Sequence, residues 1–159
     1  MITNIIEGLK QGKLFGHPIH SMLVHFPSAL FPVSLVFDVL ALLLHDVSLA
    51  SAAFYMLAAG LVGGFASVIF GAIDYYRLPA SHAAWNKASL HGLLNIIWIC
   101  LFTVVLGLRM KQYPFFQIAS PAELIFSTIG VLGLIFSNFL GGDLIFKHKL
   151  GFHEEESDS

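Results

Sequence analysis

Long apolar runs dominate the pattern of this chain, and short polar stretches separate them. Four such runs lie at about residues 22–44, 49–73, 89–108 and 121–146. Each is close to the roughly 20 residues that a helix needs in order to cross a bilayer. The pattern therefore predicts four membrane-spanning helices, the last of which is long enough to tilt.

The first sixteen residues have a different, amphipathic pattern. Apolar residues recur there at helical spacing beside two lysines, namely Ile2, Ile5, Ile6, Leu9, Lys10 and Lys13. This spacing predicts a short helix that lies in the membrane interface. We therefore expect an all-α fold, with an interfacial segment over 1–16, an integral membrane four-helix bundle within 17–151, and an acidic, disordered tail over 152–159.

The composition agrees with a membrane protein and excludes an ordinary soluble domain. Only 11% of the residues are charged and the mean hydropathy is +0.80, whereas soluble domains carry about 25% charged residues. The net charge of −2 gives no basic surface for nucleic acid. A single cysteine, Cys100, excludes an intramolecular disulfide.

The basic residues predict how the chain is oriented. Four spans place both termini on one side of the membrane, and cationic loops tend to stay in the cytoplasm. Six of the eight basic residues then fall on the side of the termini and two on the other: Lys10, Lys13, Arg77, Lys87, Lys147 and Lys149 against Arg109 and Lys111. We therefore expect both termini to be cytoplasmic.

Histidines also gather on the side of the termini. Seven of the eight histidines fall there, together with three charged residues: His17, His20, His25, His82, His91, His148 and His153, with Asp74, Arg77 and Asp143. Ionisable groups inside or beside a membrane helix often mark a functional site. The structural alternative is that these histidines bind free carbonyls, pair with Asp74 or face water.

The first apolar run contains prolines and one acid. Pro27 and Pro32 leave the carbonyls of Leu23 and Ser28 without their usual N–H donors, which predicts a kink. Asp38 lies deep in this run, so we expect it to face the bundle and to have a partner. His45, seven residues further on and near the same helix face, is the partner that the spacing predicts.

Small residues form stripes on the second and fourth runs. The stripes consist of Gly60, Gly64, Ser67 and Gly71, and of Gly130, Gly133, Ser137 and Gly141. Small residues let membrane helices approach closely. These stripes therefore predict close packing within the bundle, a homodimer contact, or a shallow groove that admits a flat cofactor.

A b-type haem is the leading hypothesis for the histidines. His25 and His91 each lie about one turn inside an apolar run on separate helices, which suits two axial ligands of one iron. His25 is expected to face inward, and Asn95 shares a helix face with His91. Surface candidates for the propionates or the rim are Arg77, His17 and His20. This hypothesis predicts electron transfer with a quinone or a redox partner protein.

Two other hypotheses remain open at this point. His17, His20, Asp74 and His91 are candidate ligands of a transition-metal ion such as zinc, copper or iron, or groups that handle protons. Alternatively, the protein is a structural membrane subunit whose glycine-rich faces bind a partner.

Several motifs resemble a predicted membrane family, catalogued as domain of unknown function 2231. The resemblance covers about residues 15–151 and rests on His17-Pro18, the segment 22–30, Gly71-Ala-Ile-Asp74 with Pro79, His91 with Asn95, and the segment 140–144. It implies a four-span protein of the bacterial inner membrane, without an established activity. Relatives joined to Rieske iron–sulfur or cytochrome c domains favour electron transfer. His17, His25, Asp74 and His91 match the family pattern, while Ser21 departs from a second His-Pro pair.

Overall fold

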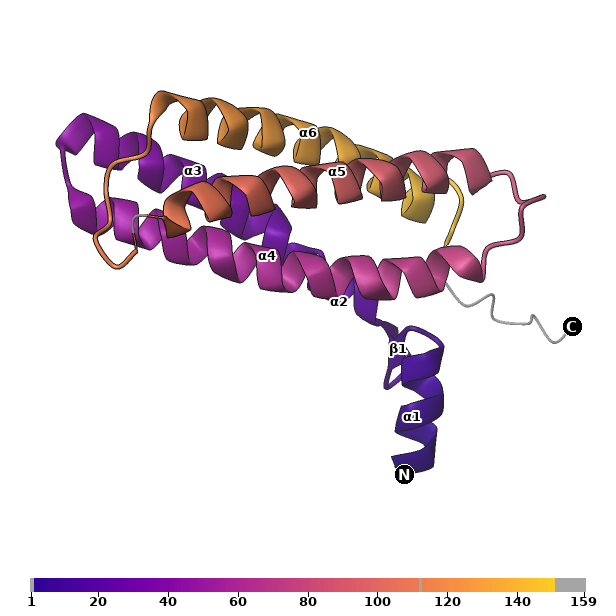
Figure 1. The fold of residues 1–159 in the computed structure, drawn as a ribbon. Coiled ribbons are helices and arrows are strands. Elements are labelled where there is room, and N and C mark those ends of the chain that lie inside the picture. The colour runs from indigo at the N-terminus through magenta and orange to yellow at the C-terminus, as the bar shows by residue number, and fades with distance from the viewer. Residues whose placement is uncertain (1, 112, 151–159) are drawn as a thin grey trace, which may run out of the picture.

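Four long helices form an antiparallel bundle, and a small N-terminal unit projects from one end of it (Figure 1). The structure is a computed structural model that describes residues 2–111 and 113–150. The helices of the bundle are α2 (Ile19–Leu23), α3 (His25–Leu44), α4 (Val47–Tyr76), α5 (Trp85–Met110) and α6 (Pro121–Phe146). The N-terminal unit contains α1 (Ile2–Lys10), β1 (Lys13–Leu14) and β2 (His17–Pro18).

The predicted all-α fold with four spans is confirmed. Four helical segments of 26 to 30 residues, with mean hydropathies between 1.9 and 2.1, are long and apolar enough to cross a membrane. The first of them consists of α2 and α3 together. The first three segments extend a few residues beyond the predicted apolar runs. The bundle therefore reaches further toward the histidine-rich end than hydropathy alone indicates.

The N-terminal unit holds two short strands that were not predicted. β1 and β2 pair antiparallel, with Lys13 opposite Pro18 and Leu14 opposite His17. Phe15 and Gly16, between the strands, have φ values of 49° and 85°. Positive φ at both central residues is typical of the tight turns that join hairpin strands. The predicted tail over 152–159 lies outside the described residues.

The first span is interrupted at Val24, which separates α2 from α3. Pro27 cannot donate to the carbonyl of Leu23, so the helix loses a hydrogen bond at this point. Pro32 lies within α3 without ending it. Asp46 and Ser120 then begin α4 and α6 by accepting backbone N–H groups of the first turn, and Ser120 forms a capping box with Glu123.

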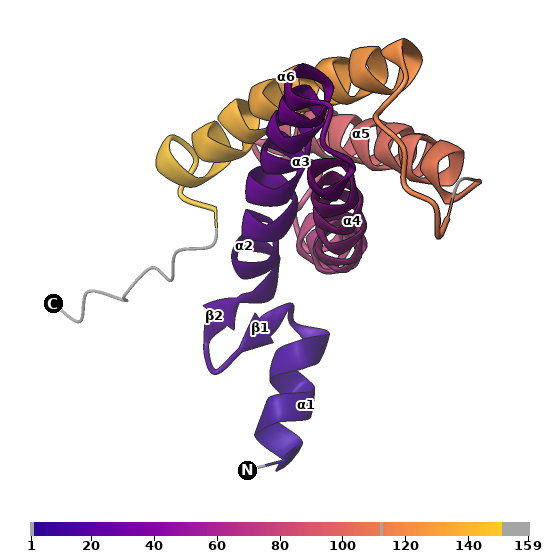
Figure 2. The ribbon, with the colours of Figure 1, turned by 90° about the vertical axis from the view of Figure 1, so that its left-hand side faces the viewer.

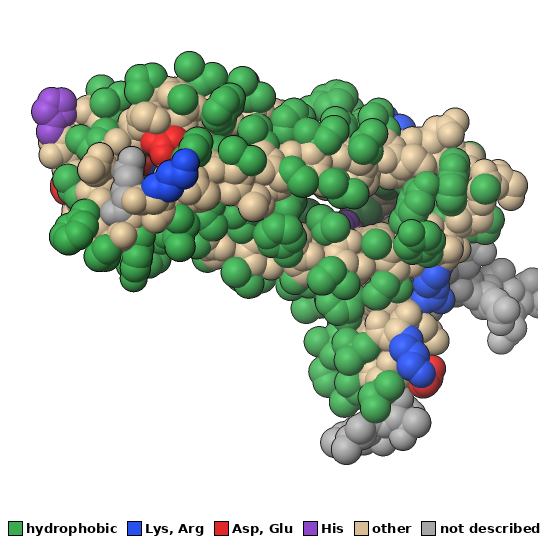
Figure 3. Space-filling view, in the orientation of Figure 1, with side chains coloured by type: hydrophobic (Ala, Val, Ile, Leu, Met, Phe, Trp, Pro, Cys, Tyr) green, Lys and Arg blue, Asp and Glu red, His purple; other side chains and the backbone are tan. Residues whose placement is uncertain are grey.

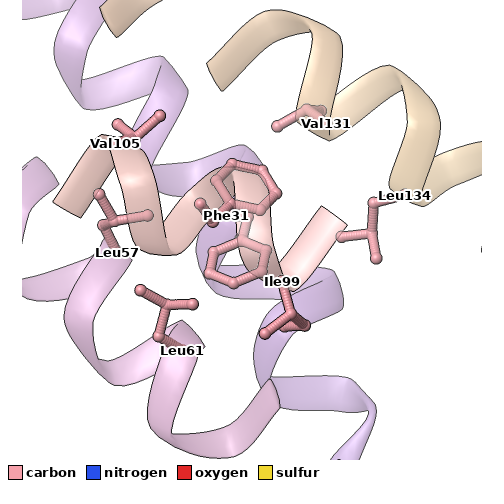
Figure 4. Packing of buried hydrophobic residues seen from close by; sticks show 8 residues of the cluster. Phe31, Leu57, Leu61, Ile99, Val105, Val131 and Leu134 are labelled. Atoms are coloured by element: carbon pink, nitrogen blue, oxygen red, sulfur yellow. The ribbon is translucent and has the colours of Figure 1, made fainter. Parts of the chain in front are cut away.

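We call α2, α3 and α4 the first hairpin, and α5 and α6 the second hairpin. Seen from the end, the helices of the second hairpin run at an angle to those of the first (Figure 2). The core lies where the two meet, and the phenyl rings of Phe31 and Phe102 stack at its centre with 3.9 Å between centroids. Figure 4 shows the surrounding cluster, which also contains Leu57, Leu61, Ile99, Val105, Val131 and Leu134.

Glycines allow the close contact within each hairpin. A Cβ atom at Gly60 would lie 2.6 Å from the ring of Phe31, and one at Gly130 would lie 2.7 Å from the ring of Phe102. On the outside of the helices apolar side chains are exposed over wide areas (Figure 3), including Val62, which is 73% exposed. Such a surface suits contact with lipid rather than water.

Candidate functional site

Two imidazoles from different hairpins meet at the end of the bundle that carries the N-terminal unit. His20 lies on α2 and His91 lies on α5, and both are half-buried. Their ring centroids are 6.4 Å apart and the ring planes are nearly perpendicular, at 82°. We call this pair, with the groups that hold it, the histidine site.

Each ring is anchored by a backbone carbonyl of the neighbouring helix. Nδ1 of His20 lies 2.8 Å from the carbonyl oxygen of Ser67 on α4, and Nδ1 of His91 lies 2.8 Å from the carbonyl oxygen of Ser137 on α6. A carbonyl oxygen only accepts hydrogen bonds, so each Nδ1 carries the hydrogen and donates it. In a neutral imidazole the Nε2 atom is then an acceptor, available to a proton or a metal.

Asn95 completes the surroundings of His91. Ser137 Oγ donates to Oδ1 of Asn95 over 3.1 Å, and Nδ2 of the amide faces His91. Asn95 Nδ2 then donates to Nε2 of His91 over 3.0 Å. His91 is therefore a neutral imidazole in this arrangement, with the tautomer set by the carbonyl of Ser137.

Glycines make room for both rings. A Cβ atom at Gly71 would lie 2.8 Å from Nδ1 of His20, and one at Gly141 would lie 2.8 Å from Cε1 of His91. Both distances are shorter than ordinary contacts, so a larger residue at either position would push the ring away. The small-residue stripes thus position the histidines as well as the helices.

His25, the predicted partner of His91, is not in this site. Its side chain is exposed, and its Nδ1 lies 3.2 Å from the carbonyl oxygen of Met22 in its own span. The prediction that His25 faces inward is therefore corrected, and His20 takes the inward place. The reason is that the first span begins at Ile19, before the predicted apolar run, so His20 already lies on a helix that packs against Ser67 and Gly71 of α4.

The other predicted site residues hold the N-terminal unit. Arg77 donates from Nη1 to the carbonyl of Gln11 over 2.8 Å. Asp74 packs against Gly12, where a Cβ atom would lie 2.6 Å from Oδ1 of the aspartate. His17 is an exposed residue of β2. These contacts attach the N-terminal unit to the end of α4.

The structure does not bring the predicted metal ligands together. Of that set, His20 and His91 meet, whereas His17 belongs to β2 and Asp74, on α4, packs against Gly12 of the N-terminal unit. Within residues 2–111 and 113–150, no three histidine, cysteine, aspartate or glutamate side chains are grouped so that they could hold a metal ion. A metal site of three or four protein ligands therefore has no support in the described part of the chain.

The opposite end of the bundle contains a buried ion pair. Arg109 donates from Nη1 and Nη2 to the two carboxylate oxygens of Asp38, over 2.9 and 2.5 Å. The side chains are only 8% and 1% exposed. Asp38 faces the bundle as predicted, but the predicted partner, His45, is wrong. His45 is exposed, and its Nδ1 lies 2.8 Å from the carbonyl oxygen of Leu42.

A comparison with protein-family models places the chain in a known group. The model of a predicted membrane protein, DUF2231, matches residues 16–154 and so covers most of the chain. No curated protein and no solved structure shows significant similarity. The chain therefore belongs to the DUF2231 family of predicted membrane proteins.

Proposed function

We propose that this protein is a small membrane b-type cytochrome, in which His20 and His91 hold a haem that transfers electrons. The observation that carries the proposal is the meeting of two imidazoles from separate hairpins, each fixed through Nδ1 by a backbone carbonyl. The proposal keeps the haem of the sequence-based hypothesis but replaces its ligand pair. Electrons would come from or go to a quinone or a redox partner protein.

The ligand geometry supports this chemistry. A histidine that binds a metal usually donates its other ring N–H to a carbonyl or a carboxylate, which fixes the tautomer and the orientation. Both histidines already make that bond, to Ser67 and Ser137. Two rings that share one metal ion, with each ligating nitrogen about 2 Å from it, have centres roughly 6 Å apart. The observed separation of 6.4 Å is close to that value.

The surroundings offer room and an unused hydrogen-bond donor. Figure 3 shows a hollow between α4 and α5 toward this end, with a histidine side chain visible inside it. The indole N–H of Trp98 is buried and has no hydrogen-bond partner within the described residues. Trp98 lies seven residues beyond His91, or about 10 Å along α5. Asn95 would release Nε2 of His91 when the ring binds iron.

The decisive test is the absorption spectrum of the purified protein, produced in cells supplied with a haem precursor. We expect a Soret band and reducible α and β bands in the wild type. Both His20→Ala and His91→Ala should lose these bands, because each removes one axial ligand. His25→Ala is the matched control and should keep them, because His25 is exposed. A colourless wild type, or bands that persist in both ligand variants, would contradict the proposal.

We also propose that the histidine site lies on the cytoplasmic side of a bacterial inner membrane. The two chain ends of the described part lie at the same end of the bundle (Figure 1). Arg109 is buried in the bundle, so it does not act as a loop charge. Of the two basic residues assigned to the far side, only Lys111 remains, which strengthens the charge asymmetry. A reporter fused after Ser159 should be active in the cytoplasm, and periplasmic activity would reverse the orientation.

A further inference from the structure

The two hairpins share a residue pattern, at an offset of 71 positions in their first helices and of 70 positions in their second. Identical residues recur 71 positions apart in α2–α3 and α5, the same separation as that of Asp38 and Arg109. These pairs are His20 and His91, Leu23 and Leu94, Leu30 and Leu101, Phe31 and Phe102, Val33 and Val104, and Leu35 and Leu106. In α4 and α6 the pattern Gly-x2-Gly-x3-Ser-x3-Gly occurs twice, at Gly60, Gly63, Ser67 and Gly71 and at Gly130, Gly133, Ser137 and Gly141.

Equivalent residues make equivalent contacts inside each hairpin. The histidine of one helix bonds the serine carbonyl of the other at 2.8 Å in both hairpins. The glycine that follows the serine by four residues faces the same histidine in both. The glycine that precedes the serine by seven residues faces the phenylalanine, Phe31 in one hairpin and Phe102 in the other. The same set of contacts within a helical hairpin thus occurs twice.

Between the hairpins, equivalent residues face one another. Phe31 stacks on Phe102, and His20 meets His91. Asp38 and Arg109, which also occupy equivalent positions, form the buried ion pair. Residues on a two-fold axis always meet their own equivalents. The three pairs therefore define a pseudo-two-fold axis that runs along the bundle. Parallel repeats of this kind, related by an axis along the membrane normal, are known among transporters.

We propose that the chain is a tandem repeat of one helical hairpin and that Asp38 and Arg109 are the residues that make the two unlike copies bind each other. At the histidine and phenylalanine levels the facing residues are identical, so they do not distinguish one copy from the other. At the third level they are complementary. Two copies of the same hairpin would instead bury two aspartates or two arginines, which is unfavourable in an apolar interior.

The axis also defines what the histidine site binds. A ligand on the axis receives one imidazole from each repeat. This part deepens the proposed function and rests on it, because it takes the ligand to be a metal centre coordinated from two opposite sides. The pairing of the repeats through Asp38 and Arg109 does not depend on any ligand.

A charge-reversal cycle in the full-length protein tests the pairing. The variants are Asp38→Arg, Arg109→Asp and the double variant, each compared by thermal midpoint and by the monodisperse fraction in detergent. The cycle is repeated with Glu123→Gln, because Glu123 lines the same small cavity as Arg109 and would repel an aspartate at position 109. Glutamine preserves the capping box with Ser120.

We expect each single reversal to lower the midpoint and to reduce the monodisperse fraction, because each buries two like charges. In the Glu123→Gln background the double variant should recover more than half of both losses. Single variants as stable as the wild type would overturn the proposal, and so would a double variant no better than the worse single. These readouts need no haem, so a colourless wild type would overturn the proposed function and leave this result unaffected.

Discussion

The two ends of the bundle deal with buried polar groups in opposite ways. At the histidine site, carbonyls of Ser67 and Ser137 satisfy Nδ1 of each ring, and Nε2 of His91 accepts a hydrogen bond from the amide of Asn95. At the far end, Asp38 and Arg109 satisfy each other through two hydrogen bonds and are almost fully enclosed. The first arrangement keeps half-buried imidazoles that a ligand could reach, whereas the second is a buried pair whose charges bind each other.

The stacked rings of Phe31 and Phe102 separate these two ends. The same pseudo-two-fold axis passes through all three levels, so the difference arises from residue type and not from position. Identical side chains on the axis are what the proposed shared ligand requires. Oppositely charged side chains on the axis form an ion pair with each other. If this contrast is right, substitutions at the far end should change mainly stability, and substitutions at the histidine site should also change cofactor binding.

The largest effect is expected when the ion pair is broken from one side. Arg109→Met leaves the carboxylate of Asp38 buried without a partner, and breaking a buried pair in this way costs about 3–5 kcal/mol. The double variant Asp38→Leu with Arg109→Met removes both charges and should lose much less. Unfolding free energies in detergent micelles measure both. Arg77→Met is the control, because Arg77 is exposed and donates to the Gln11 carbonyl away from the buried ion pair.

The contrast between the ends would be strengthened if the wild type showed the haem absorption expected from the proposed function and Arg109→Met kept it in the fraction that remains folded. Equal losses in Arg109→Met and in the double variant would contradict the account. They would mean that packing volume, and not the unpaired charge, determines stability at this end.

An intermediate effect is expected at the glycines beside the histidine rings. Gly141→Ala forces a methyl group against His91, and such overpacking costs about 1–3 kcal/mol. Gly142 is the matched control, because a Cβ atom there meets nothing within 4 Å. Gly142→Ala should leave stability unchanged or raise it by up to about 1 kcal/mol through helix propensity.

Gly71→Ala adds a test of the repeat to this comparison. Gly71 faces His20 as Gly141 faces His91, so both substitutions should lower stability and shift the Soret band by similar amounts. A spectral change from Gly142→Ala as large as that from Gly141→Ala would contradict the assignment of the ring environment.

The predictable part of this fold came from properties that are local in the chain. Long apolar runs identify the spans, because a membrane helix must be apolar over its whole length. The burial of Asp38 was predictable for the same reason. Its partner was not, because Arg109 lies 71 residues away and no local spacing relates the two. His45 had the right spacing, but it follows the end of α3, where the chain turns away with a φ of 55°.

The candidate site was predicted only in part. His91 and Asn95 were identified from helical spacing, and the two interact as expected of residues four apart. His25 was preferred to His20 because it lies deeper in the apolar run. Depth by hydropathy was misleading, since the first span begins at Ile19, before the apolar run, and already packs against α4 at His20. Ser67 and Ser137 were noted only as small residues, although the repeated glycine–serine pattern contained the signal for their role.

The smallest effect is expected at Asp46, an exposed acid at the same end as the buried ion pair. Asp46 accepts the backbone N–H of Ser48 over 2.8 Å at the start of α4. Hydrogen bonds from Ser48 hold the pKa of the Asp46 carboxyl below its ordinary value. A lowered folded-state pKa stabilises the protein above the ordinary aspartate pKa of about 4, and this contribution is lost as the pH falls through the folded-state value.

Asp46→Asn should keep the helix cap and remove this part of the pH dependence, because asparagine accepts the same N–H group without a charge. Thermal midpoints measured from pH 6 down to pH 2 in detergent should therefore fall slightly less in Asp46→Asn than in the wild type. Asp46→Ala should lower the midpoint at every pH, because it removes the cap as well. If the wild type and Asp46→Asn showed the same fall, the charge of this cap would contribute nothing measurable.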